Sequence, residues 1–175
     1  MAFQKKERSA EKREIDNARS RAIEAAWKEE KKAILQGKGS RDWTEEQQKQ
    51  IVEKGSLHGF EGHHMRSVSY GKTYEEQLAI AGDKNNIQFL EKTPKNNEHL
   101  AAHNNNTRNR TNGYYDVKTG KTIDFGTRPP QAPPKVKLSH PVYQKEKEHI
   151  DEYGVKENKN TNKQEISNKQ GIMRR

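Results

Sequence analysis

The sequence predicts an α+β fold in which two short strands and a short helix carry a group of histidines, with flanking helices and a largely irregular C-terminal tail. Three observations support this prediction. Only 28% of the 175 residues are hydrophobic and 34% are charged, so the apolar surface suffices for a compact centre of about 80 to 100 residues. Helical spacing dominates near the N-terminus, whereas Ile87-Gln88-Phe89-Leu90 alternates as a strand does. Four of the seven histidines stand in two short pieces, at 63 and 64 and at 99 and 103.

Residues 9–36 are expected to form one helix. Alanine, glutamate, lysine and arginine dominate this stretch, and Gly37 is a typical helix stop. Because its apolar stripe is thin, we interpret the segment as a solvated linker helix or one that packs only lightly on the body. A helix that binds a partner is the alternative. The stripe consists of Ile15, Ala18, Ala22, Ala26 and Ala33.

Capping boxes predict two further helices. Thr44 is followed three residues later by Gln47, which indicates a helix over residues 45–54. Thr73 begins a second box with a glutamate three residues later, and the short helix after it is expected to end at Gly82. Both helices flank the region that carries the first histidine pair.

The predicted centre consists of strand, strand and helix. Residues 60–68 hold the double histidine, and the glycines nearby favour entry from a loop into a strand. Residues 87–90 form the second strand. Thr93 and Pro94 suit the N-cap and the first position of a final helix, which continues over residues 98–103 and carries the last two histidines.

The C-terminal part is expected to be less regular. Residues 116–125 indicate a hairpin, and four prolines between residues 129 and 134 indicate a stiff, non-helical spacer. A polar tail follows, in which a short helix over residues 142–153 is possible. The predicted organisation is an N-terminal extension over 1–38, a histidine-bearing domain over 39–127, and a spacer with tail over 128–175.

Charge and composition exclude several classes of site. Lysine and arginine exceed acidic residues by 34 − 25 = 9, which favours a polyanionic partner such as nucleic acid. The chain has no cysteine, so disulfides, zinc ribbons and thiol catalysis are excluded. No apolar run approaches the length of a spanning helix, and the N-terminus lacks the apolar stretch of a signal peptide. We expect the protein either to work in the cytoplasm or to be carried to its target by other machinery.

The four clustered histidines have a spacing that suits one metal ion and one general base. On a helix, His99 and His103 share a face, so both imidazoles can reach one ion. His63 can complete a three-histidine set while His64 stays unligated, provided that both turn inward at a strand end. An ion held by three neutral imidazoles keeps an open position, which is the catalytic arrangement. A free histidine beside it is suited to deprotonate water near neutral pH.

Several ordered blocks resemble a known family. The blocks 61–64, 81–90 and 98–103, together with the flanks 41–47 and 106–109, are similar to the GHH-type HNH/endonuclease VII nucleases with a ββα-metal core, found as toxin domains of bacterial polymorphic toxin systems. The resemblance spans about residues 39–115. One departure is the stretch 92–97, which is longer than the family's usual link and lies where a loop can absorb it.

The resemblance implies a role for each site residue. The metal would be bound by His63, His99 and His103, and His64 would activate water. Asn86 would hold the loop that positions His64, although a turn residue before a strand is the plainer interpretation. Glu61 would support the site from behind the ligands, or would simply be an exposed strand residue.

Basic and aromatic residues around this region are candidates for contact with nucleic acid. Arg66, Arg108 and Arg110 are expected to grip phosphates, since a guanidinium matches phosphate oxygens with two hydrogen bonds. Tyr114 and Tyr115 could stack on a base, but packing beneath the hairpin is the preferred interpretation.

The preferred hypothesis from sequence is a metal-dependent DNA endonuclease with little sequence preference that acts as a toxin. Its cofactor would be one divalent ion, with zinc or nickel favoured by imidazole ligands and magnesium or manganese allowed by the resemblance. Its partners would be DNA and an acidic cognate immunity protein. The alternatives are a phage or mobile-element HNH endonuclease, and a non-catalytic nucleic-acid-binding module with a structural metal.

Overall fold

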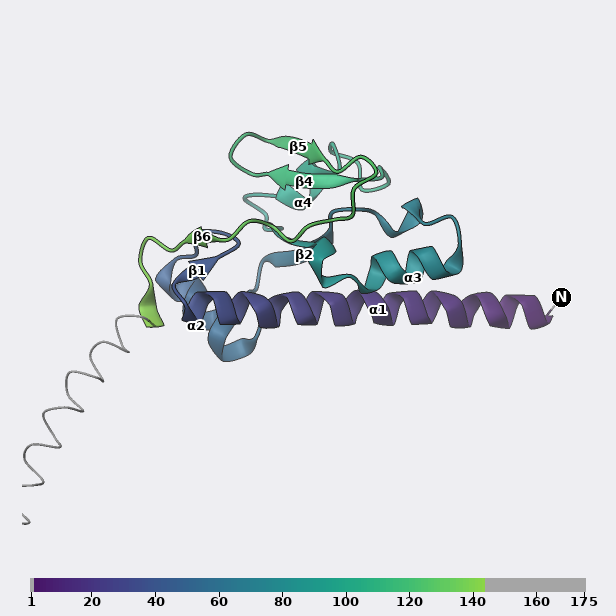
Figure 1. The fold of residues 1–175 in the computed structure, drawn as a ribbon, viewed down its shortest axis with the longest axis horizontal. Helices are drawn as coiled ribbons and strands as arrows, with labels where there is room; N and C mark the ends of the chain where they lie inside the picture. The colour runs from purple at the N-terminus through teal and green to yellow at the C-terminus, as the bar shows by residue number, and fades with distance from the viewer. Residues whose placement is uncertain (1, 144–175) are drawn as a thin grey trace, which may run out of the picture.

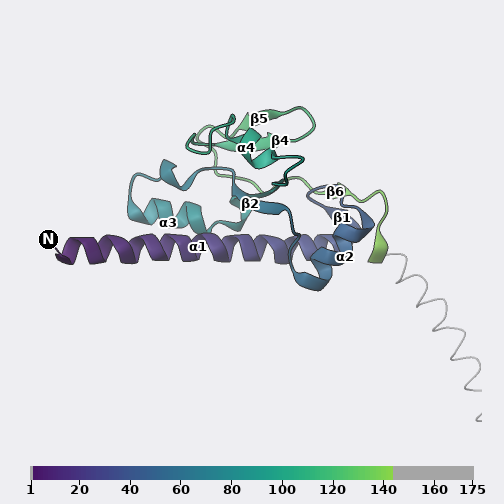
Figure 2. The ribbon, with the colours of Figure 1, turned by 180° about the vertical axis from the view of Figure 1, so that it is seen from behind.

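The computed structural model describes residues 2–143 of the chain, and their side chains from residue 10 onward. A long N-terminal helix, α1, runs along one side of the body, a middle layer holds β2, β3 and α3, and α4 with a β-hairpin covers the far side (Figure 1). The view from behind shows the same order of layers (Figure 2). The elements are α1 (Ala2–Leu35), β1 (Lys38–Gly39), α2 (Glu45–Lys54), β2 (Phe60–His64), the 3-10 turn η1 (Val68–Tyr70), α3 (Tyr74–Gly82), the 3-10 turn η2 (Lys84–Asn86), β3 (Ile87–Glu91), α4 (Glu98–Ala102), β4 (Gly113–Asp116), β5 (Lys121–Asp124) and β6 (Val136–Lys137).

The expected strand, strand and helix arrangement is confirmed. β2 pairs antiparallel with β3, with Gly62 opposite Phe89 and His64 opposite Ile87. α4 follows β3 and faces β2 on the side away from α1 (Figure 1). This is the α+β architecture of a ββα-metal core, with helices flanking it.

The interpretation of α1 as a lightly packed helix is wrong. Its Trp27 stacks on Phe89 of β3, with ring centroids 3.6 Å apart and planes inclined by 19°. Ala22 and Ala26 are buried in the same cluster, and Ala18 packs with Val68 and Ala81 in a second one. The stripe seemed thin because alanines are small, but small side chains are what allow a helix to approach a strand pair closely.

The contact between α1 and β2 depends on Gly62. A Cβ atom at this position would lie 2.8 Å from two side-chain carbons of Ile23, closer than real contacts allow. Because Gly62 has no side chain, Ile23 lies directly against the strand, one residue before the histidine pair. The glycine therefore sets the distance between α1 and the histidines.

A buried carboxylate, Glu30, joins α1 to the segments that follow β1 and precede β6. Its side chain is 0% exposed and accepts hydrogen bonds from the Ser40 N–H and the Trp43 Nε1–H, both at 2.6 Å. Lys135 donates to its second oxygen at 2.5 Å. Because each oxygen has a partner, the charge is compensated in the interior.

The two capping boxes are confirmed, and the start of the last helix is corrected. Thr44 and Thr73 both cap their helices in the expected way. The expected N-cap at Thr93 is wrong: Thr93 instead closes a turn with Asn96, and Asn97 caps α4 by accepting the Leu100 N–H. This turn absorbs the long stretch 92–97, so α4 begins at its expected register.

The predicted hairpin begins earlier than expected, at residue 113, and ends at residue 124. After it, the proline-rich segment returns to the body, where β6 pairs with β1 and the Leu138 side chain is buried in the main core.

The predicted domain boundaries at residues 38 and 127 stay predictions, and contacts cross both of them. Most of the expected helix over 142–153 lies outside the described residues. Within residues 2–143, no helix is both long and apolar enough to cross a membrane.

Glu30→Ala is expected to lower the free energy of unfolding by about 3 kcal/mol, because it leaves the indole N–H of Trp43 and the N–H of Ser40 without an acceptor. Urea unfolding measures this change. Glu24→Ala is the matched control, since Glu24 lies on the same helix in an exposed pair with Lys28 and its loss should change little. Equal effects of the two changes would contradict the assigned role of Glu30.

Candidate metal centre and cleft

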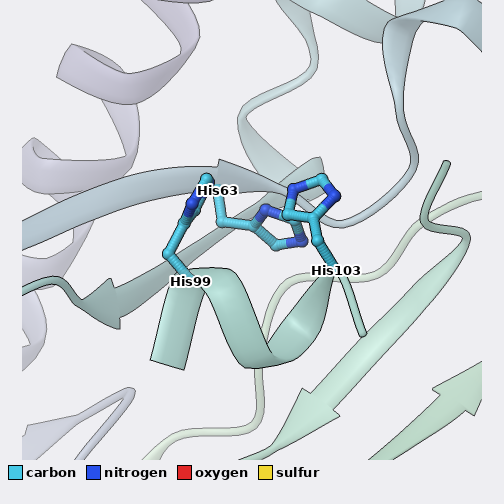
Figure 3. Close-up of side chains that lie close together, drawn as sticks. All are labelled: His63, His99 and His103. Atoms are coloured by element: carbon cyan, nitrogen blue, oxygen red, sulfur yellow. The ribbon is translucent and has the colours of Figure 1, made fainter. Parts of the chain in front are cut away.

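Three imidazoles from two elements meet at one point. His63 extends from β2 toward α4, where His99 and His103 stand one turn apart (Figure 3). The ring centroids of the three pairs are 5.0 to 5.2 Å apart, and one nitrogen of each ring lies within 4.8 Å of the others. The expected convergence of these three residues is confirmed, and together they could hold a metal ion.

The donor set fits a metal cation. His63 is 3% exposed, and its Nε2 is buried without any hydrogen-bond partner in the described part of the chain. A buried polar atom without a partner is costly, and coordination of a cation would remove that cost. Burial, and then the nearby His99 and His103, lower the pKa of His63 from 6.5 to about 3. Burial also lowers the pKa of His99. Both rings are therefore neutral at physiological pH, as metal ligands must be.

His103 is oriented by a residue that the sequence did not single out. Its Nδ1 donates to the Asn109 carbonyl oxygen at 2.8 Å, and the Asn109 side-chain amide donates back to the His103 carbonyl oxygen at 2.9 Å. This leaves Nε2 of His103 as the atom with a free lone pair, a common arrangement for metal-binding histidines. The chain reaches Asn109 by a tight turn in which Asn104 and Asn105 have φ values of 51° and 61°. Asparagine adopts such φ values more readily than most residues, which explains the asparagine run after α4.

An ion pair holds α4 against the sheet. Glu98, the first residue of α4, binds the two terminal nitrogens of Arg41 at 2.5 and 2.9 Å and accepts the Glu91 N–H of β3 at 2.8 Å. Burial alone would raise the pKa of the Glu98 carboxyl, but the hydrogen bonds from Arg41 and Glu91 hold it below its ordinary value. The pair fixes the residue directly before His99. No local pattern pairs residues 41 and 98, because their contact exists only in the folded chain.

His64 lies beside the three histidines but outside their group. It ends β2, and its Nε2 donates to the Ala81 carbonyl oxygen at the end of α3, at 2.9 Å. Since a carbonyl only accepts, the proton is on Nε2 and the lone pair is on Nδ1. Burial lowers the pKa of His64, and the positive charge of Arg19 lowers it further. The hydrogen bond to Ala81 acts in the opposite direction and raises it. The ring is thus held neutral in one tautomer.

Asn86 fixes the chain directly after His64. Its side chain is fully buried, and its Oδ1 accepts the Arg66 N–H at 2.7 Å while its Nδ2 donates to the Arg66 carbonyl oxygen at 2.9 Å. The Met65 N–H donates to the Asn86 carbonyl oxygen, also at 2.9 Å. Asn86 also ends the turn η2, so the two interpretations made from sequence are compatible.

The histidines open into a cleft of about 570 Å³. One wall comes from α1 and α3, with Arg19, Ile23 and Gln77, and the other comes from the loop over residues 107–110. The two expected arginines of that loop, Arg108 and Arg110, line the cleft. Arg19 was not predicted. A signal existed, since it follows Ala18 of the apolar stripe and stands four residues before Ile23, but the stripe was interpreted as solvated.

Three expected residues lie elsewhere. Glu61 is exposed and pairs with Lys92 at 2.7 Å, away from the cleft lining. Arg66 donates to the Asn112 side chain and to the carbonyl oxygens of residues 126 and 128, so its guanidinium is committed to protein acceptors and holds the hairpin. Tyr115 bonds through its backbone N–H and carbonyl oxygen to the Gln88 side chain of β3, which joins the hairpin to that strand, and the packing of its ring beneath the hairpin stays a prediction.

Comparison with protein families gives one match. Residues 9–91 match the family described as a GHH signature containing HNH/endonuclease VII superfamily nuclease toxin. The matched segment includes α1, both strands and the His63-His64 pair. Part of α1 thus belongs to the family's own pattern.

The chain is also similar to short segments of much longer animal proteins. It is 35% identical over 77 residues to teneurin-3 of Mus musculus and 34% identical over 79 residues to teneurin-3 of Danio rerio. Teneurin-m of Drosophila melanogaster is 32% identical over 76 residues. These matches cover 43%, 45% and 43% of this chain, and only 3% of each relative.

The metal-free protein should lose stability as the pH falls from 6.5 toward about 3. Over this range the unfolded chain protonates residue 63 whereas the folded protein does not, because burial lowers the pKa of His63 to about 3. The free energy of unfolding should then fall by up to about 1.4 kcal/mol per pH unit.

Urea unfolding with a chelator at several pH values measures this slope. His63→Leu should make it shallower, while the exposed His58→Leu should leave it unchanged. A His63→Leu slope equal to that of the parent would contradict the assignment.

Proposed function

Because residues 9–91 carry the GHH-signature domain of the HNH/endonuclease VII superfamily nuclease toxins, we propose that this protein is a metal-dependent endonuclease that hydrolyses DNA with little sequence preference and acts as a bacterial toxin. The observation that carries the proposal is the convergence of His63, His99 and His103, with one ring nitrogen of each within 4.8 Å of the others, in a cleft that also holds His64. Ligands for a cation, a base and a cleft that a substrate can enter thus lie in one place.

Each histidine has a separate task in this proposal. His63, His99 and His103 bind one divalent ion, which when bound supplies a positive charge that polarises a phosphate and neutralises charge on the leaving oxygen. His64 accepts the proton of the attacking water at Nδ1, because its Nε2–H is held by the Ala81 carbonyl oxygen. Asn86 positions the base by fixing the backbone two residues later. Glu61 lies outside the cleft lining and stays a candidate only for an electrostatic effect on His99, because burial lowers the pKa of His99 and the charge of Glu61 raises it.

The surroundings of the histidines support a phosphodiester substrate without strong base recognition. Arg108 and Arg110 line the cleft, and contacts from guanidinium groups to phosphates do not depend on base sequence. The net charge of +9 adds a general attraction to polyanions. DNA is therefore the proposed substrate.

The identity of the ion is proposed from the donors. Three imidazoles favour zinc or nickel over the harder magnesium and manganese ions, which prefer oxygen ligands. The cleft leaves room beside the histidines for a phosphate. This openness favours a catalytic site over a closed structural one.

His64→Ala should reduce plasmid cleavage by about 10²- to 10⁴-fold while zinc binding by calorimetry stays close to that of the parent. His103→Ala should lose both, because it removes a proposed ligand. The exposed His58→Ala is the matched control and should keep both properties. Plasmid digestion across zinc, nickel, magnesium and manganese, with and without EDTA, provides the measurement.

Undiminished cleavage by His64→Ala, or cleavage that EDTA does not affect, would overturn the nuclease proposal. Metal binding without cleavage by the parent would favour a non-catalytic binding module.

A toxic nuclease requires neutralisation in the cell that makes it, so we expect an acidic immunity protein encoded beside it, and delivery into a target cell. Binding between the two should weaken as salt concentration rises, because opposite net charges drive their association. Affinity capture from the native host at low and high salt tests this. If no small acidic protein is captured and phage genes flank the coding sequence, a phage or mobile-element nuclease becomes the better assignment.

A further inference from the structure

The cleft has a basic residue on the wall that the histidine motif does not supply. Arg19 lies on α1, Arg108 lies in the loop over residues 107–110, and both line the cleft into which the histidines open. A polyanion that fills this cleft therefore meets basic side chains from two separate segments of the chain.

The arginines of this region differ in whether their guanidinium groups are already engaged. Arg66 and Arg41 are committed, the first to the hairpin and the second to Glu98. Arg110 lies over the Tyr70 ring, 5.5 Å from its centroid. Among the side chains described from residue 10 to 143, none hydrogen-bonds or pairs with the guanidinium of Arg19. An exposed, unpaired guanidinium on a cleft wall is available to bind an anion.

The position of Arg19 relative to the histidines is fixed by packing. The neighbouring Ala18 is 4% exposed and packs with Ala81, the residue whose carbonyl oxygen holds His64. On the next turn, Ile23 lies against Gly62, one residue before His63. The first contact ties this part of α1 to α3, which holds the base His64, and the second ties it to β2, the strand that carries the base and a ligand. The arginine therefore projects from a rigid support.

We propose that Arg19 binds a phosphate of the substrate strand, so that the polynucleotide backbone is held between α1 and the 107–110 loop. This inference rests on the proposed function, since it names a substrate contact of the same site. A guanidinium offers two parallel N–H groups to phosphate oxygens and stays charged at every relevant pH. The ligand is the phosphodiester backbone, which DNA and RNA share.

The test is binding of fluorescein-labelled DNA and RNA oligonucleotides of the same sequence to the metal-free protein, measured by anisotropy over a salt series. Arg19→Ala should weaken binding about tenfold at low salt and reduce the salt slope by about one unit. Arg19→Lys should restore the slope and only part of the affinity, because it keeps the charge and loses the fork. Arg21→Ala is the matched control: it removes an exposed arginine of the same helix that lies outside the cleft, and should change neither value.

Calorimetric zinc binding and the melting temperature should be the same in all variants, which separates a substrate contact from a structural one. If Arg19→Ala binds nucleic acid like the parent while Arg108→Ala does not, the inference is overturned and the nuclease proposal stands. If binding depends on Arg19 but the zinc-loaded parent cleaves nothing, the inference stands and the nuclease proposal fails. A parent protein that binds neither oligonucleotide overturns both.

Discussion

The close approach of α1 to β2 at Gly62 is the contact on which the rest of the structure depends. A two-stranded sheet is marginally stable alone, and here α1 covers one face of β2 and β3 through Ile23 and Trp27. Since successive strand residues point to opposite faces, this choice of covered face directs His63 toward α4 (Figure 3) and His64 toward α3, where it donates to the Ala81 carbonyl oxygen. The packing of α1 on one face of β2 thereby separates the group of three histidines from the fourth.

The buried polar side chains around the site differ in whether they have hydrogen-bond partners, and this difference corresponds to whether they hold the structure or could hold a cation. Asn86, Glu98 and Glu30 are buried or partly buried, and the side-chain oxygens of each accept hydrogen bonds, so these groups hold backbone and helices in place. Among the described residues, the Nε2 of His63 and the Oγ of Ser40 are the buried side-chain atoms without a partner. Unsatisfied buried atoms are rare in folded proteins, and only His63 also has two further imidazoles beside it, so His63 is where an external cation would belong.

Local patterns predicted local structure well. The capping boxes at Thr44 and Thr73, the alternating strand from Ile87 and the four-residue spacing of His99 and His103 all describe interactions between residues close in sequence, and each was found where expected. Two failures involve partners far apart in the chain, since Arg41 with Glu98 and Glu30 with Lys135 join segments that no spacing rule connects. A third failure is local: Thr93 lost the N-cap position to Asn97, because both residue types are able caps. The role of α1 was underestimated because an alanine stripe has little hydrophobicity but permits close packing.

The position of α1 has a consequence for what the histidine motif can do by itself. Strand β2 supplies His63 and His64, and the five-residue α4 with its C-cap residue supplies the other two rings, yet neither element is stable alone. α4 is anchored by Arg41, whose backbone follows β1, and β2 is anchored by α1. Two segments that precede the histidines, α1 and the segment that carries Arg41, thus impose the geometry that brings the three imidazoles together. A bound cation would add to this organisation, because its ligands come from β2 and α4 and coordination would join the two elements directly.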